Sequence, residues 1–138
     1  MKSRVNERVK HREWFRPFAP AVLESHAGDF FNTFPGIDLS AMTVTVDAHP
    51  MPAERIPAVV HVDRTARVQT VSAELNGRWK PLLDSFHSIT GIPMVLNTSF
   101  NDQNEPIVES PADAIQTFLG TEMDALVMGD YLIEKNLV

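Results

Sequence analysis

The sequence predicts a mixed α/β (α+β) fold in which helices pack against a twisted sheet. Short apolar segments alternate along the 138 residues with segments of helical periodicity. Glycine and proline together supply 16 residues and separate these segments, as turns do between short elements. Two β-branched segments in the middle of the chain are joined by a short polar linker, which adds an antiparallel pair. With no repeat or flexible linker evident, residues 1–138 are expected to form a single domain.

The N-terminal part is predicted to hold a short helix, an extended segment and a second helix. Val5 and Val9 share one face of a helix over residues 3–11. The two prolines that follow exclude a helix interior, so an extended segment leads into a strand at residues 21–23. Ser25 is then expected to cap a brief helix that carries two phenylalanines.

The middle of the chain is predicted to be rich in strands. A loop is expected at residues 33–41, and a proline-rich connection at residues 49–57. Between and after them, β-branched and apolar side chains predict three strands, which are Thr43–Val46, Ala58–Val62 and Arg67–Val71. The polar residues between the last two strands predict a tight antiparallel connection.

A helix near residues 80–90 is the clearest element of the sequence. It should bury one apolar stripe and end at Gly91, since glycine suits the left-handed position after a helix. The stripe consists of Leu82, Leu83, Phe86 and Ile89. The wholly apolar segment at residues 93–96 then predicts a short strand buried on both faces.

The last helix has a distinct start signal. Ser110 is its expected N-cap, and Asp113 occupies the third helical position as in a capping box, so the helix spans residues 111–119. Its expected buried face consists of Ile115, Phe118 and Leu119. A final strand over residues 124–133 is expected to bury its first half, residues 125–128.

Charge is distributed unevenly along the chain. The net charge is −6, but residues 1–20 hold six lysines and arginines against two glutamates, a net charge of +4. The remaining 118 residues carry a net charge of −10. Proteins that bind nucleic acids in general present a basic face, so this acidic remainder argues against that function. The basic segment is either a local anion site or a solvated terminal helix.

Several classes of protein are excluded or disfavoured by composition. No run of 18 apolar residues exists and the charged N-terminus lacks a secretory pattern, so we expect a cytoplasmic protein without membrane contact. The absence of cysteine excludes disulfides and thiolate sites and fits a reducing compartment. The five histidines show no metal-ligand spacing, so no metal site is predicted. Without a phosphate-binding loop or a nucleophile motif, electrostatic positioning of a charged substrate is the expected route of catalysis.

Three features are candidates for binding an anion. In an extended segment, Lys10 and Arg12 would point the same way and suit a phosphate, whereas at a helix C-terminus they would complement its dipole. Arg67, within an apolar segment, either points to solvent or requires an anion. Small polar residues directly follow the apolar strand, where α/β sheets bind ligands, although an ordinary turn uses the same residue types. These residues are Asn97, Thr98, Ser99 and Asn101.

Five long phrases resemble the C-terminal domain of NodU/CmcH-type O-carbamoyltransferases. In order, they are VNERVKHREWFRPFAPAVLE, IPAVVHVDRTARVQTV, GIPMVLNTSFN, EPIVESPADAIQTF and DALVMGDYLI. The resemblance covers nearly the whole chain and implies a YrdC-like fold. It further implies a domain that takes carbamoyl phosphate and ATP and forms a carbamoyl-adenylate. An N-terminal Kae1-like domain of the same polypeptide would then transfer the carbamoyl group to a hydroxyl of a sugar or natural product such as an antibiotic.

The resemblance also assigns roles to the candidate residues. Lys10 and Arg12 match a Lys-x-Arg pair of YrdC-like domains, and Ser99 and Asn101 match a Ser-x-Asn pair. Arg67 matches the arginine of the family's ARVQTV phrase and resembles a third phosphate-binding cation. The implied catalytic residues are Lys10, Arg67 and Ser99, and the implied ATP- and substrate-binding residues are Arg12, Thr98, Asn101 and Asn97.

These assignments lead to testable expectations about the site. Lys10, Arg67 and Ser99 should line one concavity, and Lys10 should be a surface residue whose replacement costs little stability. Mg²⁺ is expected to arrive with ATP, because the sequence shows no carboxylate cage of its own. The alternative is a non-catalytic YrdC-like module that binds RNA or another anionic ligand through the basic segment.

Three departures from the family pattern bear on activity. A stretch of the form FGPRALGNRS normally precedes the basic helix, and this chain starts after it. The N-terminal transfer domain is likewise expected outside this sequence. Arg64 and Asn104 stand where the family usually has glycine. Because asparagine tolerates positive φ and arginine does so poorly, this third departure is expected to alter a turn near the site.

Overall fold

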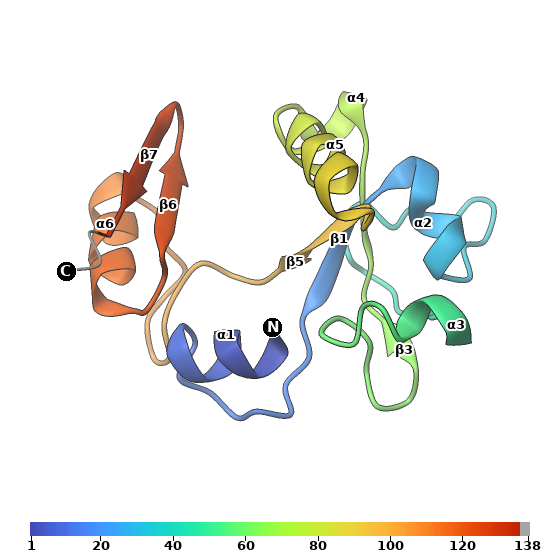
Figure 1. The fold of residues 1–138 in the computed structure, drawn as a ribbon, viewed down its shortest axis with the longest axis horizontal. Helices are drawn as coiled ribbons and strands as arrows, with labels where there is room; N and C mark the ends of the chain where they lie inside the picture. Colours follow the sequence, from blue (N-terminus) through green and yellow to red (C-terminus); the bar gives the residue numbers. More distant parts are fainter. Residues whose placement is uncertain (136–138) are drawn as a thin grey trace. The chain divides into compact units, whose positions relative to one another are not determined.

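The computed structural model describes residues 1–135 and divides into two compact units, drawn with their elements in Figure 1. Unit 1 comprises Met1–Arg16 and the chain from Ser99 onward, and unit 2 comprises Pro17–Thr98. Helices and strands occur in both units, which confirms the predicted mixed α/β class. That the two units act as one domain stays a prediction. Within residues 1–135, no helix combines the length and apolar character that crossing a bilayer requires.

Unit 2 is built on a three-stranded sheet that contains both strand orientations. Its strands are β1 (Ala19–Leu23), β4 (Gln69–Val71) and β5 (Met94–Asn97), in the order β4-β1-β5. β1 runs parallel to β4, with Ala21 opposite Gln69, and antiparallel to β5, with Ala21 opposite Val95. All five residues of β1 are buried, as expected for a central strand covered on both faces.

Short helices and a small strand pair complete unit 2. The helices are α2 (Glu24–Phe30), α3 (Pro50–Ala53), α4 (Ala73–Asn76) and α5 (Trp79–Thr90), and the pair consists of β2 (Val46–Asp47) and β3 (Thr65–Ala66). α2 and α5 both pack against β1. α5 ends as predicted, because Gly91 adopts a left-handed φ of +70° and its N–H bonds the carbonyl of His87.

Several predicted elements of unit 2 are wrong in extent or kind. The strand expected at residues 43–46 is reduced to β2, and residues 58–62 form turns instead of a strand. The strand expected at residues 67–71 keeps only its last three residues, and the connection at residues 49–57 contains α3. Ser25 caps nothing, because α2 begins one residue before it. β-branched residues form strands only where a neighbouring strand supplies hydrogen bonds and packing, which a linear sequence does not reveal.

The apolar stripe predicted for α5 is only partly buried. Leu83 is completely buried in a core cluster with residues of β1 and β4, but Leu82 is 55% exposed and Ile89 is 84% exposed. Phe86 is also exposed. One row of the helix therefore contacts the sheet, and the rest of the predicted stripe does not.

Unit 1 combines segments from both ends of the described chain. Its elements are α1 (Lys2–Arg8), α6 (Pro111–Gly120), β6 (Ala125–Met128) and β7 (Tyr131–Glu134). The capping box predicted for α6 is confirmed, because Ser110 Oγ accepts from the Asp113 N–H and the Asp113 carboxylate accepts from the Ser110 N–H. β6 and β7 lie side by side as an antiparallel pair, with α6 packed against β6 (Figure 1).

The core of unit 1 is smaller than the sequence predicts. Phe118 is buried with Ala114 and Leu126, whereas Ile115 and Leu119 are exposed. The single strand expected over residues 124–133 is two strands, because Gly129 reverses the chain with a φ of +61°. Of the four residues in β6, only one is buried, since a two-stranded pair covered on one side buries alternate residues.

Candidate functional site

Lys10 lies at the centre of a polar cluster in unit 1, together with Ser99 and Asn101. Its Nζ lies 3.0 Å from the carbonyl oxygen of Ser99 and 3.3 Å from Ser99 Oγ. The same nitrogen lies 2.5 Å from the carbonyl oxygen of Asn101 and 2.6 Å from Asn101 Oδ1. Lys10 is only 5% exposed, so the expectation of a surface lysine is wrong. The structure nevertheless brings together the Lys-x-Arg and Ser-x-Asn phrases, whose contacting residues Lys10 and Ser99 lie 89 positions apart.

The end of α1 places Lys10 in this position. The chain closes the helix with the Lys10 N–H donating to the Val5 carbonyl, and His11 then adopts a left-handed φ of +44°. Of the two geometries considered for residues 10–12, the extended one is not found, so strand alternation does not orient these side chains. Arg12 turns back toward the helix, where its Nε donates to Asn6 Oδ1 at 2.8 Å.

The loop after Ser99 is organised by its own hydrogen bonds. Ser99 Oγ donates to Asn101 Oδ1 at 2.7 Å, and Asn101 Nδ2 donates to the carbonyl of Glu105 at 2.9 Å. Asn104 has a φ of +65°, the left-handed geometry expected where the family has glycine. The loop thus presents oxygens from several residues to the single ammonium of Lys10.

Burial and neighbouring charges shift the ionisation of this cluster. Burial lowers the pKa of Lys10 and the nearby Arg12 cation lowers it further, while Asp102 and Glu105 partly oppose the change. Burial also lowers the pKa of Arg12, and Arg16 adds to this effect. The site is therefore one in which positive charges are crowded and partly desolvated, a setting that favours a bound anion.

Two neighbouring features were not predicted as parts of the site. Asn6 is completely buried, and its Nδ2 donates to the carbonyls of Trp14 and Arg16 at 3.2 and 3.0 Å. His11 lies against Asp102, with Nδ1 2.7 Å from Oδ1 and 2.9 Å from Oδ2. An uncharged residue inside a basic helix is a weak sequence signal for Asn6. No local signal connects His11 with a residue 91 positions away.

The other predicted site residues belong to unit 2. Asn97 is the last residue of β5, and its Nδ2 donates to Oε1 of Gln69, the first residue of β4, at 2.7 Å. The Asn97 side chain therefore has a structural partner within unit 2. Thr98 and Arg67 are exposed, and Arg67 lies just before β4 without a hydrogen-bond or ion-pair partner among residues 1–135. Lys10 and Ser99 are in contact, whereas the convergence of Arg67 with them stays a prediction.

The basic N-terminal segment is largely neutralised within unit 1. Arg4 pairs with Asp124 at 3.3 Å, Arg8 with Glu122 at 3.5 Å, and Arg16 with Glu13 at 3.1 Å. Because Lys10 is buried as well, the segment displays far less free positive charge than its sequence suggests. This arrangement disfavours a broad surface for nucleic-acid phosphates, which requires exposed cations on one face.

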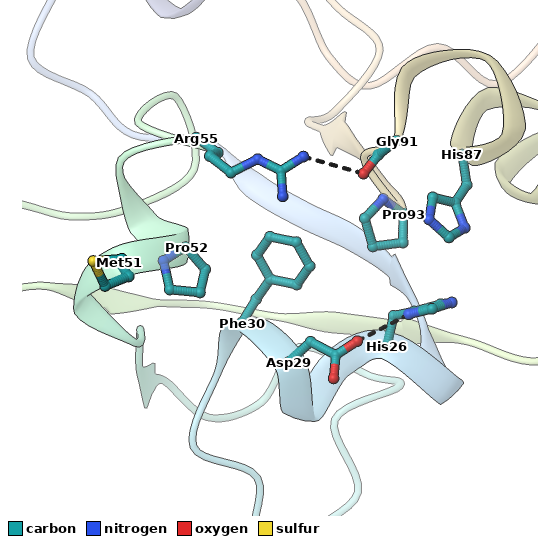
Figure 2. Close-up of a pocket in the computed structure, with 9 residues that line it drawn as sticks. All are labelled: His26, Asp29, Phe30, Met51, Pro52, Arg55, His87, Gly91 and Pro93. Atoms are coloured by element: carbon teal, nitrogen blue, oxygen red, sulfur yellow. Dashed lines mark hydrogen bonds and ion pairs between the residues drawn. The ribbon is translucent and has the colours of Figure 1, made fainter.

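Two hollows lie outside the Lys10 cluster. Figure 2 shows one in unit 2, about 490 Å³ in volume, with Phe30 and Pro93 between Arg55 and the imidazoles of His26 and His87. Arg55 donates to the Gly91 carbonyl there at 3.3 Å. The other hollow, in unit 1, is about 700 Å³ and is bordered by three carboxylates, from Glu105, Glu109 and Asp113, which do not suit a phosphate. None of the seven predicted site residues lines either hollow.

Over residues 1–135, no three His, Asp or Glu side chains come close enough to share an ion. A cation that accompanies a nucleotide would therefore depend on phosphate oxygens for most of its ligands.

Comparison with known proteins defines the relationships of the chain. The sequence model of the family described as "Carbamoyltransferase C-terminus" matches residues 1–135 and so spans both units. The nodulation protein NolNO of Sinorhizobium fredii (strain NBRC 101917 / NGR234) is 47% identical over 135 residues, which are 97% of this chain and 20% of that protein. NolO of Bradyrhizobium diazoefficiens is 44% identical over 135 residues, which are 97% of this chain and 25% of NolO. Nodulation protein U of Rhizobium tropici is 44% identical over 101 residues, which are 73% of this chain and 17% of that protein. The chain thus spans about a quarter or less of the length of these relatives.

Proposed function

Because this chain belongs to the carbamoyltransferase C-terminal family, we propose that it supplies activated carbamoyl groups within an O-carbamoyltransferase. In this proposal it binds carbamoyl phosphate and ATP and forms a carbamoyl-adenylate. A Kae1-like N-terminal domain of the same polypeptide then transfers the carbamoyl group to a hydroxyl of a sugar or another natural product. Two of the relatives are named as nodulation proteins, so an acceptor that functions in nodulation is one proposed class. The proposed location is the cytoplasm, where ATP is available.

The observation that supports this proposal most strongly is the Lys10 cluster. The resemblance assigns the Lys-x-Arg and Ser-x-Asn phrases to ligand binding. They are in contact because the Lys10 ammonium lies within 3.3 Å of four oxygens of Ser99 and Asn101. A buried lysine is costly unless its charge is satisfied, so the loop that carries Ser99 is held in a defined place. Such preorganisation is what phosphoryl-transfer chemistry needs from a protein.

The proposed reaction has a simple balance of bonds. Water first cleaves carbamoyl phosphate into carbamate and inorganic phosphate. A carbamate oxygen then attacks the α-phosphorus of ATP and forms a P–O bond, while the bond from that phosphorus to the bridging oxygen breaks and pyrophosphate leaves. Mg²⁺ bound with ATP would neutralise charge on the phosphates. No protein nucleophile is needed, because alignment and charge neutralisation lower the barrier.

The residues of this chain would have distinct roles in that reaction. Ser99 is exposed, and its hydroxyl, which donates to Asn101 Oδ1 at 2.7 Å in this structure, would turn from Asn101 to donate to a phosphoryl or carbamoyl oxygen. Lys10 would fix the loop and lend its charge, since its ammonium is already directed at loop oxygens. Arg12 and Arg67 would balance phosphate charge, with Thr98 and Asn97 as further members of the substrate site.

The proposal is tested by measuring ligand binding and pyrophosphate release with the 138-residue chain. We expect saturable binding of Mg-ATP by calorimetry and carbamoyl-phosphate-dependent release of pyrophosphate. Ser99→Ala should lower the release about 10–100-fold without a large change in melting temperature, because it removes the hydroxyl that would turn from Asn101 to donate to the developing charge. Ser88→Ala is the matched control, since that hydroxyl only bonds the Asp84 carbonyl of its own helix in unit 2.

Other results would point elsewhere. RNA affinity that falls steeply with salt, without saturable ATP binding, would favour the non-catalytic RNA-binding module. Equal pyrophosphate release by wild type and Ser99→Ala would remove Ser99 from the site. Absence of both ATP binding and release would overturn the proposed activity of this chain.

A further inference from the structure

The pair formed by His11 and Asp102 has a defined protonation pattern. Asp102 accepts His11 Nδ1 with both carboxylate oxygens, at 2.7 and 2.9 Å. Burial acts to raise the pKa of Asp102, but hydrogen bonds from His11 and from the Gln103 N–H, with the charges of His11 and Lys10, outweigh it and lower the pKa. An ionised carboxylate only accepts hydrogen bonds, so Nδ1 carries the proton and Nε2 is the ring nitrogen left for another partner.

Backbone geometry directs this imidazole toward the loop. His11 has a φ of +44°, an uncommon conformation for a residue with a side chain, although histidine adopts it more readily than most. A residue held there costs stability that its surroundings must offset. The hydrogen bonds to Asp102 supply part of that compensation. The strain is therefore stored at the residue directly after Lys10.

The pair is directly adjacent to the Lys10 cluster in sequence and in space. His11 follows Lys10, and Asp102 follows Asn101, the residue that contacts the Lys10 ammonium. Asp102, the partner of the imidazole, also interacts with the charge of Lys10, and Lys10 in turn interacts with Arg12, Asp102 and Glu105. Glu105 is fixed by its bond from the Asp102 N–H at 3.1 Å.

Donor availability distinguishes His11 from Lys10. The Lys10 ammonium has three N–H groups and already faces four oxygens of Ser99 and Asn101. His11 Nε2, by contrast, has no partner within residues 1–135, and the His11 side chain is 44% exposed. An incoming anion can therefore reach His11 without breaking a hydrogen bond of the loop.

We infer that His11 contacts the anionic group of the substrate through Nε2, and that Asp102 is its positioning residue. This inference rests on the proposed function, because it names a further contact at the same site. Imidazolium donates from Nε2 to a phosphoryl oxygen, whereas the neutral ring with Nδ1 protonated offers only a lone pair there. Anion affinity should therefore be lower for the neutral ring than for the imidazolium.

The test uses sulfate, because its charge does not change between pH 5.5 and 8.0. We expect sulfate to bind the 138-residue chain about tenfold more weakly at pH 8.0 than at pH 5.5, as measured by calorimetry or by competition with ATP. Imidazole ¹⁵N NMR should show Nδ1–H as the neutral tautomer, and sulfate should move the His11 signals toward those of imidazolium. A purely structural histidine would show neither response to sulfate.

Two variants keep the test independent of folding. His11→Asn suits the left-handed conformation and removes the titrating group, so it should bind sulfate weakly and equally at both pH values. Asp102→Asn should remove the tautomer preference and weaken sulfate binding at pH 5.5. His26→Gln is the matched control, because His26 makes a similar pair with Asp29, Nδ1 to Oδ2 at 2.9 Å, in unit 2. It should leave the pH dependence unchanged.

The outcomes separate this inference from the proposed function. If His11→Asn binds sulfate with the affinity and pH dependence of the wild type while Mg-ATP still binds, the inference fails and the proposed function stands. If the wild-type chain binds neither sulfate nor ATP, both fail. If His26→Gln, and not His11→Asn, abolishes the pH dependence, the responsive anion site lies in the hollow of unit 2 and the inference is overturned.

Discussion

The two units of the chain are stabilised in different ways. In unit 2 the central strand β1 is buried along its whole length, and its neighbours in the core are apolar. In unit 1 the apolar core is small, and all four buried polar residues found within residues 1–135 belong to it. They are Asn6, Lys10, Thr117 and Thr121.

The buried polar residues of unit 1 all have partners. Thr121 Oγ1 donates to the Thr117 carbonyl at 2.8 Å, and Thr117 Oγ1 donates to Glu105 at 3.2 Å. Asn6 and Lys10 have the bonds described above. Polar groups that are buried and satisfied fix a unique arrangement, but removing one partner leaves the others unsatisfied. The comparison teaches that unit 2 depends on close packing, whereas unit 1 depends on completed hydrogen-bond networks beside the proposed site.

The largest effect is expected from a cavity in unit 2. Leu83→Ala should lower the free energy of unfolding by about 2–5 kcal/mol, because it removes a completely buried side chain from the core. The adjacent Leu82→Ala, on the same helix but more than half exposed, should change it by less than about 0.5 kcal/mol. Urea unfolding of both variants measures the difference. Similar losses for the two leucines would mean that the predicted stripe of α5 is covered after all.

Removing the central ammonium of unit 1 should have the next largest effect. Lys10→Ala should cost about 1.5–3 kcal/mol, because oxygens of Ser99 and Asn101 lose a charged donor. Lys80→Ala is the control, since Lys80 forms an exposed i,i+4 pair with Asp84 and should cost about 0.5 kcal/mol or less. Thermal and urea unfolding test this contrast. Equal costs would show that burial of Lys10 adds nothing to stability.

Relief of backbone strain in unit 2 should give a smaller change, in the stabilising direction. Arg64 has a φ of +66°, and its carbonyl accepts from the Ala48 N–H at 2.8 Å, so the backbone cannot easily relax. Arg64→Gly should raise the free energy of unfolding by about 0.5–1 kcal/mol, the balance of relieved strain and added chain entropy. Asn104→Gly in unit 1 should change it less, because asparagine tolerates this conformation. A loss of stability in Arg64→Gly would contradict this account.

The smallest effect is expected from the acid titration of Asp102. Its pKa is lower in the folded state than in the unfolded chain, so the ionised group stabilises unit 1 above about pH 4. This stabilisation is lost as the pH falls through the lower, folded-state pKa. Asp102→Asn should therefore be less stable than wild type at pH 6, and the gap should close on acidification below about pH 4. The same gap at pH 6 and pH 3 in urea unfolding would argue against an ionised Asp102 as the cause.

Local sequence signals predicted the ends of elements better than their burial. The capping box at Ser110 and the helix end at Gly91 depend on side chains and φ angles within one turn, and both are confirmed. The stripe of α5 and the face of α6 were overestimated, since periodicity shows which residues share a face but not how wide a surface covers it. Strands 43–46 and 58–62 failed for a similar reason, because their partners lie elsewhere in the chain.

For the candidate site too, local sequence and tertiary structure contributed different information. The long phrases led to Lys10, Ser99 and Asn101 as candidates, and the structure brings these three side chains into contact. The phrases gave no warning that Lys10 is buried, because its burial depends on the turn at His11 and on a loop 89 residues away. His11 and Asp102 are 91 residues apart and match no motif, so only their coordinates relate them.

The sequence by itself therefore determined the family, the mixed α/β class and two helix boundaries, the start of α6 at Ser110 and the end of α5 at Gly91. These properties reside in contiguous residues, whose propensities and capping interactions act over one or two turns. Only the tertiary structure decided which apolar faces are covered, how the ends of the chain combine into unit 1, and that one ammonium joins the two phrases. Burial and hydrogen bonding between distant residues depend on chain reversals such as the one at His11, and the energy of each contact exists only once both partners are in place.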